Sequence, residues 1–343
     1  MNPQFTRNVN FPGKIVLLDG ISGTGKTMIS RILDTYTMNH VPKFGYAIEQ
    51  ICIASYRGKI QQDAAITLLK LQADQVKYDM HIGREVNFRP RDLSSVLKSS
   101  KKIPYLIKAI SKDGPDVIEN LISKRMNIVI ISHQLLKATE IFDLAFNDSF
   151  INIHTIRNPL YLFNHWASYV NVQCSSPRDF TVWKQEAGIT IPWFFTNQEN
   201  YSEYETLSTG DKTIVCLIEL INQALEHHFN WKNKPNYICL EFEKFVLNPK
   251  PVMLILDKIL GDKSIKDTLR VQREEKLPRG HISDSKKMPI YNRYGDKGRI
   301  NKMNHKDDYN NRMDEVKRLS SEKYFNKFKD LIARYESEFE TWF

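Results

Sequence analysis

The segment from Gly20 to Thr27 fits the spacing G-x-x-x-x-G-K-[ST], with every fixed position filled. The apolar run Ile15–Leu18 before it predicts a buried strand, and the residues after it predict a helix. In this setting, glycines let the backbone turn successive N–H groups inward, and the helix presents the positive end of its dipole to the same anion. A glycine turn that merely caps a helix is disfavoured by the preceding strand. The sequence therefore predicts a loop that binds a phosphorylated nucleotide.

The length of 343 residues suits one α/β core with a helical insertion. The four cysteines (Cys52, Cys174, Cys216 and Cys239) are widely spaced and form no metal-binding pattern, so we expect reduced thiols and no bound metal. A net charge of +9 indicates an anionic partner, but no nucleic-acid motif accompanies it, so nucleic acid is disfavoured. No apolar run reaches about 18 residues and the N-terminal residues lack a signal-peptide core, so we expect a soluble, cytoplasmic protein without a transmembrane segment.

Strand-like apolar runs recur at residues 14–19, 127–132, 150–156 and 236–241, separated by helical segments. This alternation predicts an α/β fold, in which helices flank a parallel sheet. Residues 34–126 have a mostly helical pattern and predict an insertion between the first two strands. Residues 274–310 are polar and basic, which is typical of a long surface loop, and a terminal helix is expected over about 311–340. We expect residues 1–343 to form one domain.

Polar residues follow the predicted strands. The second strand runs into Ser132-His133, the third into Arg157-Asn158-Pro159, and the fourth is followed by the segment Phe242–Pro249. Ligands of open α/β sheets bind beyond the carboxyl ends of the strands, so we expect His133 and Arg157 to lie beside the loop. Arg offers a planar fork suited to phosphate, and a neutral imidazole is a competent base at neutral pH. Taken singly, a histidine satisfied in the core and an arginine paired with a carboxylate are the simpler interpretations.

With these elements in this order over residues 15–260, the chain resembles the P-loop sulfotransferases that use a nucleotide sulfate. The resemblance implies that 3′-phosphoadenylyl sulfate (PAPS) is the donor, that no metal is needed, and that a hydroxyl or amine is the acceptor. It implies that Arg157 binds the 3′-phosphate and that His133 is the catalytic base. It assigns the donor's 5′-phosphosulfate to the loop, with Lys26 also acting in catalysis; the loop residues are Gly20, Ser22, Gly23, Thr24, Gly25, Lys26 and Thr27.

The chain departs from the family pattern at several positions. Lysine stands at Lys26, as in kinase loops, rather than just before the Ser-Gly-Thr sequence. A serine of the family that binds the 3′-phosphate is replaced by His165, with Ser168 one helical turn further, and either residue fits that role. A late Arg-Lys-Gly segment has two partial matches, one around Lys297-Gly298-Arg299 and one at Arg279-Gly280. We favour Lys297, Gly298 and Arg299 because they lie closer to the terminal helix.

Two other functions remain open. A small-molecule kinase using ATP and Mg²⁺ would normally end a neighbouring strand in a metal-binding Asp, whereas these strands end in His133 and Arg157; Asp19, directly before the loop, keeps this alternative open. The other is a nucleotide-binding regulator without catalysis, which His133 disfavours.

The sequence leaves the acceptor and the oligomeric state undetermined. The acceptor can be an anionic glycan, a phenolic small molecule or a lipid headgroup. One candidate surface is the basic patch from Arg84 to Lys102, which is equally well a solvated face. The other is the aromatic stretch from Trp183 to Tyr204, whose rings are either an acceptor wall or packing residues.

Overall fold

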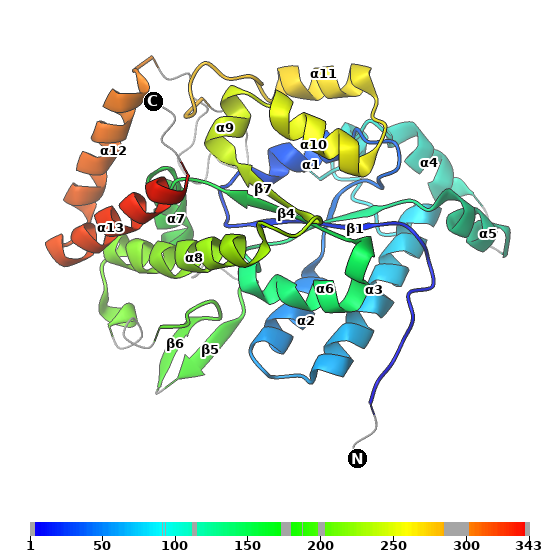
Figure 1. The fold of residues 1–343 in the computed structure, drawn as a ribbon, viewed down its shortest axis with the longest axis horizontal. Coiled ribbons are helices and arrows are strands. Elements are labelled where there is room, and N and C mark those ends of the chain that lie inside the picture. The colour runs from blue at the N-terminus through cyan, green and yellow to red at the C-terminus, as the bar shows by residue number, and fades with distance from the viewer. Residues whose placement is uncertain are drawn as a thin grey trace.

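The computed structural model describes residues 4–339, apart from 91, 93, 112–114, 173–179, 187, 198–202 and 285–301. At its centre lies a five-stranded sheet in the order β2-β3-β1-β4-β7, in which all pairings are parallel (Figure 1). The strands are β1 (Ile15–Gly20), β2 (Lys43–Phe44), β3 (Ile128–Ile131), β4 (Phe150–Ile156) and β7 (Tyr237–Glu241). The predicted α/β class and all four predicted strands are confirmed.

The central strands β1 and β4 are buried along their whole length. A parallel sheet is covered on both faces, which is why its strands read as continuous Ile, Val and Leu runs rather than as alternating patterns. In the register of the sheet, Leu17 of β1 lies opposite Ile130 of β3 and Asn152 of β4. This register brings Gly20, Ser132 and Arg157 to the same edge of the sheet.

Three short strands were not predicted. β2 has only two residues and pairs with β3, while β5 (Trp183–Glu186) and β6 (Ile189–Pro192) form a separate antiparallel hairpin. None of the three contains an apolar run long enough to be recognised as a strand.

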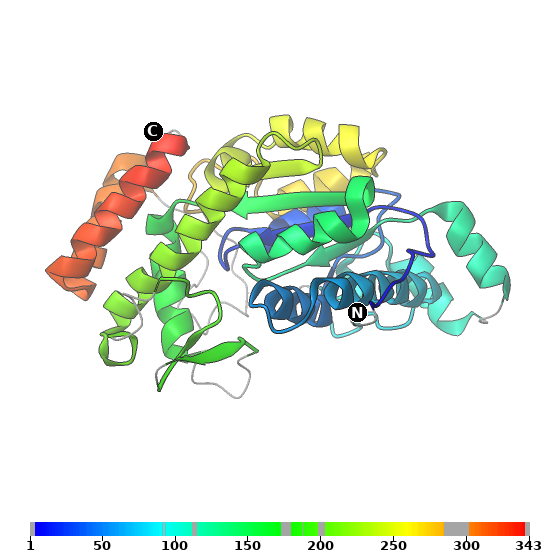
Figure 2. The same cartoon turned by 60° about the horizontal axis from the view of Figure 1, so that its bottom comes forward.

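Helices cover both faces of the sheet and extend it at either end (Figures 1 and 2). One face carries α1 (Lys26–Leu33), α9 (Phe242–Leu247), α10 (Lys250–Leu260) and α11 (Ile265–Glu274), and the other carries α2 (Tyr46–Tyr56), α3 (Gln62–Ile82) and α6 (Glu140–Phe146). At one end α7 (Pro159–Val172), α8 (Thr209–Trp231), α12 (His305–Leu319) and α13 (Glu322–Glu338) pack together, and at the opposite end lie α4 (Lys102–Ile110) and α5 (Pro115–Lys124). Short 3₁₀ turns occupy Val96–Lys98, Leu136–Thr139, Asn147–Ser149 and Tyr204–Thr206.

The C-terminal region differs from the prediction of one helix over 311–340. Two helices are present, and the first begins at His305, within the expected loop, where the Asn304 side chain accepts a hydrogen bond from the Asp307 N–H at 2.8 Å. Ser320 is extended, and the Ser321 N–H donates to Asp211 of α8 at 2.9 Å. This contact turns the chain between α12 and α13, a feature that helical periodicity alone does not reveal.

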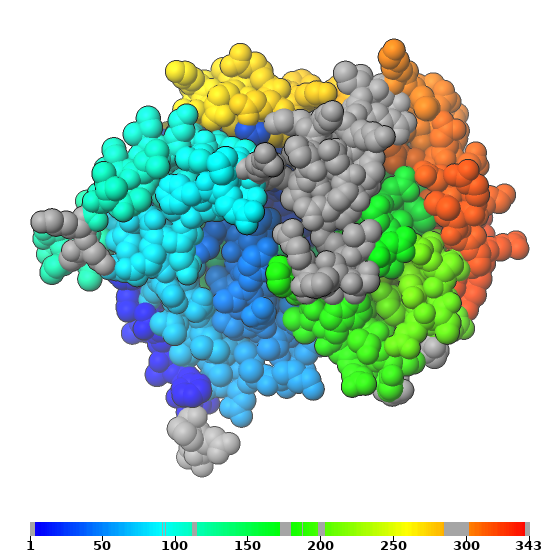
Figure 3. All heavy atoms as spheres, turned by 180° about the vertical axis from the view of Figure 1, so that it is seen from behind, coloured from blue at the N-terminus to red at the C-terminus, as the bar shows by residue number. Residues whose placement is uncertain are grey.

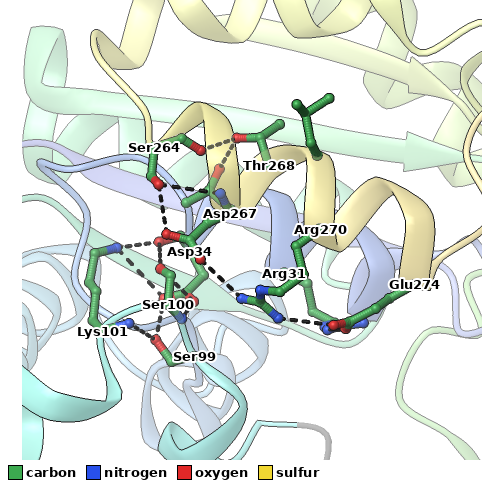
Figure 4. A network of polar contacts seen from close by, with 12 residues as sticks. Arg31, Asp34, Ser99, Ser100, Lys101, Ser264, Asp267, Thr268, Arg270 and Glu274 are labelled. Atoms are coloured by element: carbon green, nitrogen blue, oxygen red, sulfur yellow. Dashed lines mark hydrogen bonds and ion pairs between the residues drawn. The ribbon is translucent and has the colours of Figure 1, made fainter.

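A polar network fixes α1, the helix that follows the predicted phosphate loop (Figure 4). Arg31 forms ion pairs with Glu274 and Glu275 at the end of α11. One turn later, the Asp34 carboxylate accepts hydrogen bonds from the Ser99 hydroxyl and the Ser100 N–H, both at 2.9 Å. The network therefore joins α1 to α11 and to the segment that leads into α4.

Within the described part of the chain, no helix is long and apolar enough to cross a membrane. Cys52, Cys216 and Cys239 are free thiols, as expected, and Cys174 lies outside the described residues.

Candidate functional site

The loop between β1 and α1 has the backbone conformation that its glycines allow. Gly20, Gly23 and Gly25 have φ values of 144°, 96° and 89°. A Cβ on Gly20 would lie 2.2 Å from the Thr155 carbonyl oxygen, and one on Gly25 would lie 2.7 Å from the Phe242 ring. Glycine is therefore required at these two positions both by the left-handed backbone and by the close approach of β4 and α9.

Side chains from α7 support the outside of this loop. The indole N–H of Trp166 donates to the Ser22 carbonyl oxygen at 3.0 Å, and His165 Nε2 lies 3.0 Å from the Ser22 hydroxyl. Of the two residues considered at this position, His165 thus contacts the loop directly, and Ser168 lies one turn further along α7. Trp166 was not identified from the sequence, because its contact joins positions 144 residues apart.

Two of the predicted loop ligands point inward. The Thr24 hydroxyl donates to the Ile21 carbonyl oxygen at 2.7 Å and lies 2.6 Å from the Thr155 hydroxyl, so it is used within the protein. Lys26 is buried, and its ammonium donates to the carbonyl oxygens of Gly20 and, at 3.0 Å, of Ile21. Burial lowers the pKa of Lys26 to about 8, against the opposing effects of Asp19 and Glu49. The Lys26 ammonium therefore lies on the inner side of the loop, against its backbone carbonyl oxygens.

The Asp19 carboxylate ties the loop to the end of β3. It accepts hydrogen bonds from the Ser132 hydroxyl at 2.6 Å and from the N–H groups of Leu135 and Leu136 at 3.0 and 2.7 Å. Burial raises the pKa of this carboxyl, but nearby Lys26 and these hydrogen bonds outweigh burial and hold the pKa below its usual value. Asp19 is therefore a charged structural anchor that fixes the segment containing His133.

His133 is oriented by Glu49 of α2. Its backbone N–H donates to Glu49 at 3.1 Å, and its Nδ1 lies 3.0 Å from the same carboxylate oxygen. The imidazole stacks on Phe44, with ring centroids 4.9 Å apart, and Tyr46 lies beside it at 5.9 Å. The His133 side chain is 37% exposed while that of Glu49 is 10% exposed. A proton held between Nδ1 and Glu49 leaves Nε2 as the basic nitrogen of a partly exposed ring.

Arg157 adjoins the other side of the loop. Its Nη1 donates to the Gly23 carbonyl oxygen at 2.9 Å, and its guanidinium lies 4.1 Å from the centre of the Phe242 ring. Burial and the nearby Arg312 and Arg279 lower the pKa of Arg157 to about 10, against the opposing effect of Glu243. The expected juxtaposition of Arg157 with the loop is therefore present.

Arg279 and Arg312 join Arg157 to form a cluster that we call the arginine cluster. Arg279 follows α11 and lies 5.6 Å from the Phe242 ring centre, while Arg312 of α12 lies 4.6 Å from that of Tyr161. Arg312 Nε donates to Asp308 at 3.0 Å. Among the described residues, the buried Nε atoms of Arg157 and Arg279 have no hydrogen-bond partner. Since buried donors are normally satisfied, these two suit an anionic ligand.

The cluster also bears on the two partial matches to the family's late segment. Arg279, the match that the sequence placed second, belongs to the arginine cluster. The favoured residues, Lys297, Gly298 and Arg299, lie outside the described residues.

Most rings of the aromatic stretch are packing residues. Trp193, Phe194, Phe195 and Tyr204 are buried in the core. Arg57 of the α2 end donates to the carbonyl oxygens of Trp193 and, at 2.7 Å, of Phe195. The acceptor-wall interpretation is therefore wrong for these four rings, and the rings beside His133 come instead from Phe44 and Tyr46.

The predicted basic patch is partly neutralised by neighbouring acids. Arg84 pairs with Asp79 at 3.2 Å, and Lys101 lies 3.6 Å from Asp34. Arg91 lies outside the described residues. The patch is therefore not one continuous field of unpaired charge.

No protein-family profile and no curated protein sequence matches the chain. Among solved structures, it is similar to the sulfotransferase domain of the olefin synthase of Synechococcus PCC 7002, with 12% identity and a TM-score of 0.41 over 97% of this chain and 98% of that one. It is also similar to sulfotransferase STF9 from Mycobacterium avium, with 11% identity and a TM-score of 0.40 over 97% and 78% of the two chains. A third is retinol dehydratase in complex with androsterone and the inactive cofactor PAP, with 13% identity and a TM-score of 0.39 over 98% and 84%. Identities and TM-scores this low do not assign a function to this chain.

Proposed function

We propose that the protein is a sulfotransferase that moves a sulfuryl group from PAPS to a hydroxyl or amine. The observation that carries this proposal is that the loop and the arginine cluster adjoin each other, since Arg157 donates to the Gly23 carbonyl oxygen at 2.9 Å. PAPS carries anionic groups at two separate places, the 5′-phosphosulfate and the 3′-phosphate. The loop suits the 5′-phosphosulfate. The Nε atoms of Arg157 and Arg279, which are buried without a hydrogen-bond partner, suit the 3′-phosphate.

In this proposal, Lys26 and the backbone N–H groups of the loop bind the 5′-phosphosulfate. His165, close to Ser22, borders the donor site, and Ser168 stays a proposed ligand one turn further on α7. His133 is the base. The role proposed for Lys297, Gly298 and Arg299 in closing over the 3′-phosphate is retained as a prediction.

The reaction follows from these positions. The acceptor oxygen or nitrogen attacks sulfur in line, while the bond from sulfur to the bridging phosphate oxygen breaks. The acceptor proton passes to Nε2 of His133, whose ring Glu49 holds through Nδ1. The leaving group is adenosine 3′,5′-bisphosphate (PAP), and the charge that develops on its bridging oxygen is stabilised by Lys26 and the loop.

Asp19 argues against the kinase alternative. Its carboxylate accepts three hydrogen bonds from the segment around His133, so using it to hold Mg²⁺ would dismantle the segment that it anchors. The regulator alternative is disfavoured by the Glu49–His133 pair, which has the arrangement of an oriented base.

Ligand-dependent thermal stability tests the donor. PAP without metal, at a concentration about 100 times its Kd, should raise the free energy of unfolding by about 2.7 kcal/mol, because it binds only the folded state. ATP with Mg²⁺ should stabilise it much less. The reverse ranking would favour the kinase.

Turnover of the base variant separates the enzyme from a regulator. With an acceptor found by screening glycans, phenols and lipid headgroups, His133→Ala should lower kcat about 10²- to 10⁴-fold and leave PAP binding intact. Unchanged turnover in this variant would show that His133 is not the base.

A further inference from the structure

Helix α4 exposes an apolar face. Ile103, Leu106, Ile107 and Ile110 are 61%, 45%, 58% and 86% exposed. Their spacing of three, four and seven residues places them on one side of the helix. On α5, Ile118 and Ile122, four residues apart, are also exposed. An amphipathic helix normally turns its apolar side to the core, so α4 is oriented the opposite way. We call the four exposed apolar side chains of α4 the isoleucine face.

The orientation of α4 is fixed by its inner side. Tyr105 is fully buried, and its hydroxyl lies 2.8 Å from His40 Nδ1 and accepts the Val41 N–H at 3.3 Å. At the start of the helix, Lys101 contacts Asp34 in the network drawn in Figure 4. Rotating α4 to bury its isoleucines would break these contacts. The apolar side is therefore held outward by the fold.

Helix α4, which carries the isoleucine face, and helix α5 stand at the edge of the molecule (Figures 1 and 2). Figures 1 and 2 show α4 and α5 at the end opposite α12 and α13. In Figure 3, which shows the molecule from behind, the cyan-to-teal segment containing them forms a projecting margin. A face at such a margin can meet a flat surface without obstruction from the rest of the protein.

Positive charges border the isoleucine face. Lys102, Lys124 and Arg125 are exposed, and from residue 96 to 125 the sequence has seven Lys or Arg against three Asp or Glu. Burial, together with the nearby Lys124 and Lys101, lowers the pKa of Lys108 to about 8. These cations thus lie close enough to repel one another, and an anionic partner would relieve that repulsion.

We propose that the isoleucine face docks onto the surface of an anionic lipid bilayer, with its apolar side chains at the headgroup boundary and its lysines on lipid phosphates. A second copy of the chain fits less well. A two-fold dimer through this face would bring the same basic border of both copies together and increase the repulsion. The inference does not depend on the proposed reaction.

Vesicle sedimentation of the full chain tests this surface. The protein should sediment with phosphatidylcholine vesicles that contain phosphatidylserine, much less with phosphatidylcholine alone, and progressively less as salt is added. Ile107→Glu/Ile110→Glu should weaken binding at least about tenfold. Lys102→Ala/Lys124→Ala should weaken it about fivefold per lysine.

A matched control lies on the α10–α11 surface, where Leu254 and Leu269 are likewise exposed. Leu254→Glu/Leu269→Glu should bind vesicles like the unaltered protein, and all variants should keep its urea midpoint, since every substituted side chain is exposed. Equal loss in the control variant, or no sedimentation of the unaltered protein with anionic vesicles, would overturn the proposal. So would a dimer in sedimentation velocity that Ile107→Glu/Ile110→Glu converts to a monomer while vesicle binding is unchanged.

Discussion

The Nδ1 atom of His133 lies 3.0 Å from a carboxylate oxygen of Glu49, a residue 84 positions earlier in the chain. The same oxygen accepts the backbone N–H of His133 at 3.1 Å, so one carboxylate fixes both the main chain and the ring. Burial raises the pKa of Glu49, and the hydrogen bond from His133 opposes that effect. Glu49 is thus a positioning residue for the proposed base.

Glu49→Gln should lower kcat about 10- to 10²-fold, which corresponds to the free energy of about one charge-assisted hydrogen bond. The glutamine oxygen can still accept the Nδ1 proton, but it carries no charge to stabilise the imidazolium. PAP affinity, measured by calorimetry, should stay unchanged. Glu226→Gln is the matched control, because Glu226 is exposed and pairs with Lys137 rather than with His133. An equal fall in turnover and in PAP affinity for Glu49→Gln would mean that Glu49 supports the nucleotide site instead.

The arginine cluster predicts selective recognition of the 3′-phosphate. Arg279→Ala and Arg312→Ala should each weaken PAP binding about 10- to 10²-fold, the range expected for a charge-assisted phosphate contact. Binding of adenosine 5′-monophosphate, which lacks the 3′-phosphate, should change little. Arg318→Ala, an exposed position on the same helix as Arg312, should leave both affinities unchanged. Parallel losses for both nucleotides would assign the cluster another role.

Gly25 and Gly58 form a matched pair for the loop. Both have positive φ, 89° and 64°, but a Cβ on Gly25 would meet the Phe242 ring at 2.7 Å, while nothing lies within 4 Å of one on Gly58. Gly58→Ala should lower the free energy of unfolding by about 1–2 kcal/mol, because alanine is strained in the left-handed backbone conformation. Gly25→Ala should cost more and should also weaken PAP binding, because displaced Phe242 no longer supports Arg157. Urea unfolding and calorimetry measure the two effects, and equal stability of both variants would contradict the contact.

Stability should fall as the pH is lowered from 7 to 5. Burial lowers the pKa of His154 to about 4, although Asp19 opposes this effect. The pKa of a histidine in the unfolded chain is about 6.5. At pH values between about 6.5 and about 4, the unfolded chain therefore binds more protons than the folded one, and lowering the pH favours unfolding. The full difference between the two pKa values of His154 corresponds to a loss of about 3 kcal/mol in the free energy of unfolding. In urea unfolding at several pH values, His154→Phe should make the free energy of unfolding depend less on pH. An unchanged pH dependence in this variant would mean that other groups cause it.

The predicted phosphate loop and the strands beside it could be recognised from the sequence alone. The loop is a contiguous motif whose glycines and lysine have fixed spacing, and the four long strands are apolar runs that suit burial on both faces. The position of Arg157 also followed, since the carboxyl ends of parallel strands share one edge of the sheet.

Which distant side chains join the candidate site depends on contacts that exist only in the folded chain. Glu49, Arg279 and Arg312 reach it from α2, the segment after α11, and α12, and no spacing rule links them to His133 or Arg157. Packing also buried the Trp193–Phe195 rings and turned the α4 isoleucines outward, although both segments are apolar. Periodicity tells which side of a helix is apolar, but what that side faces depends on contacts between residues far apart in the chain.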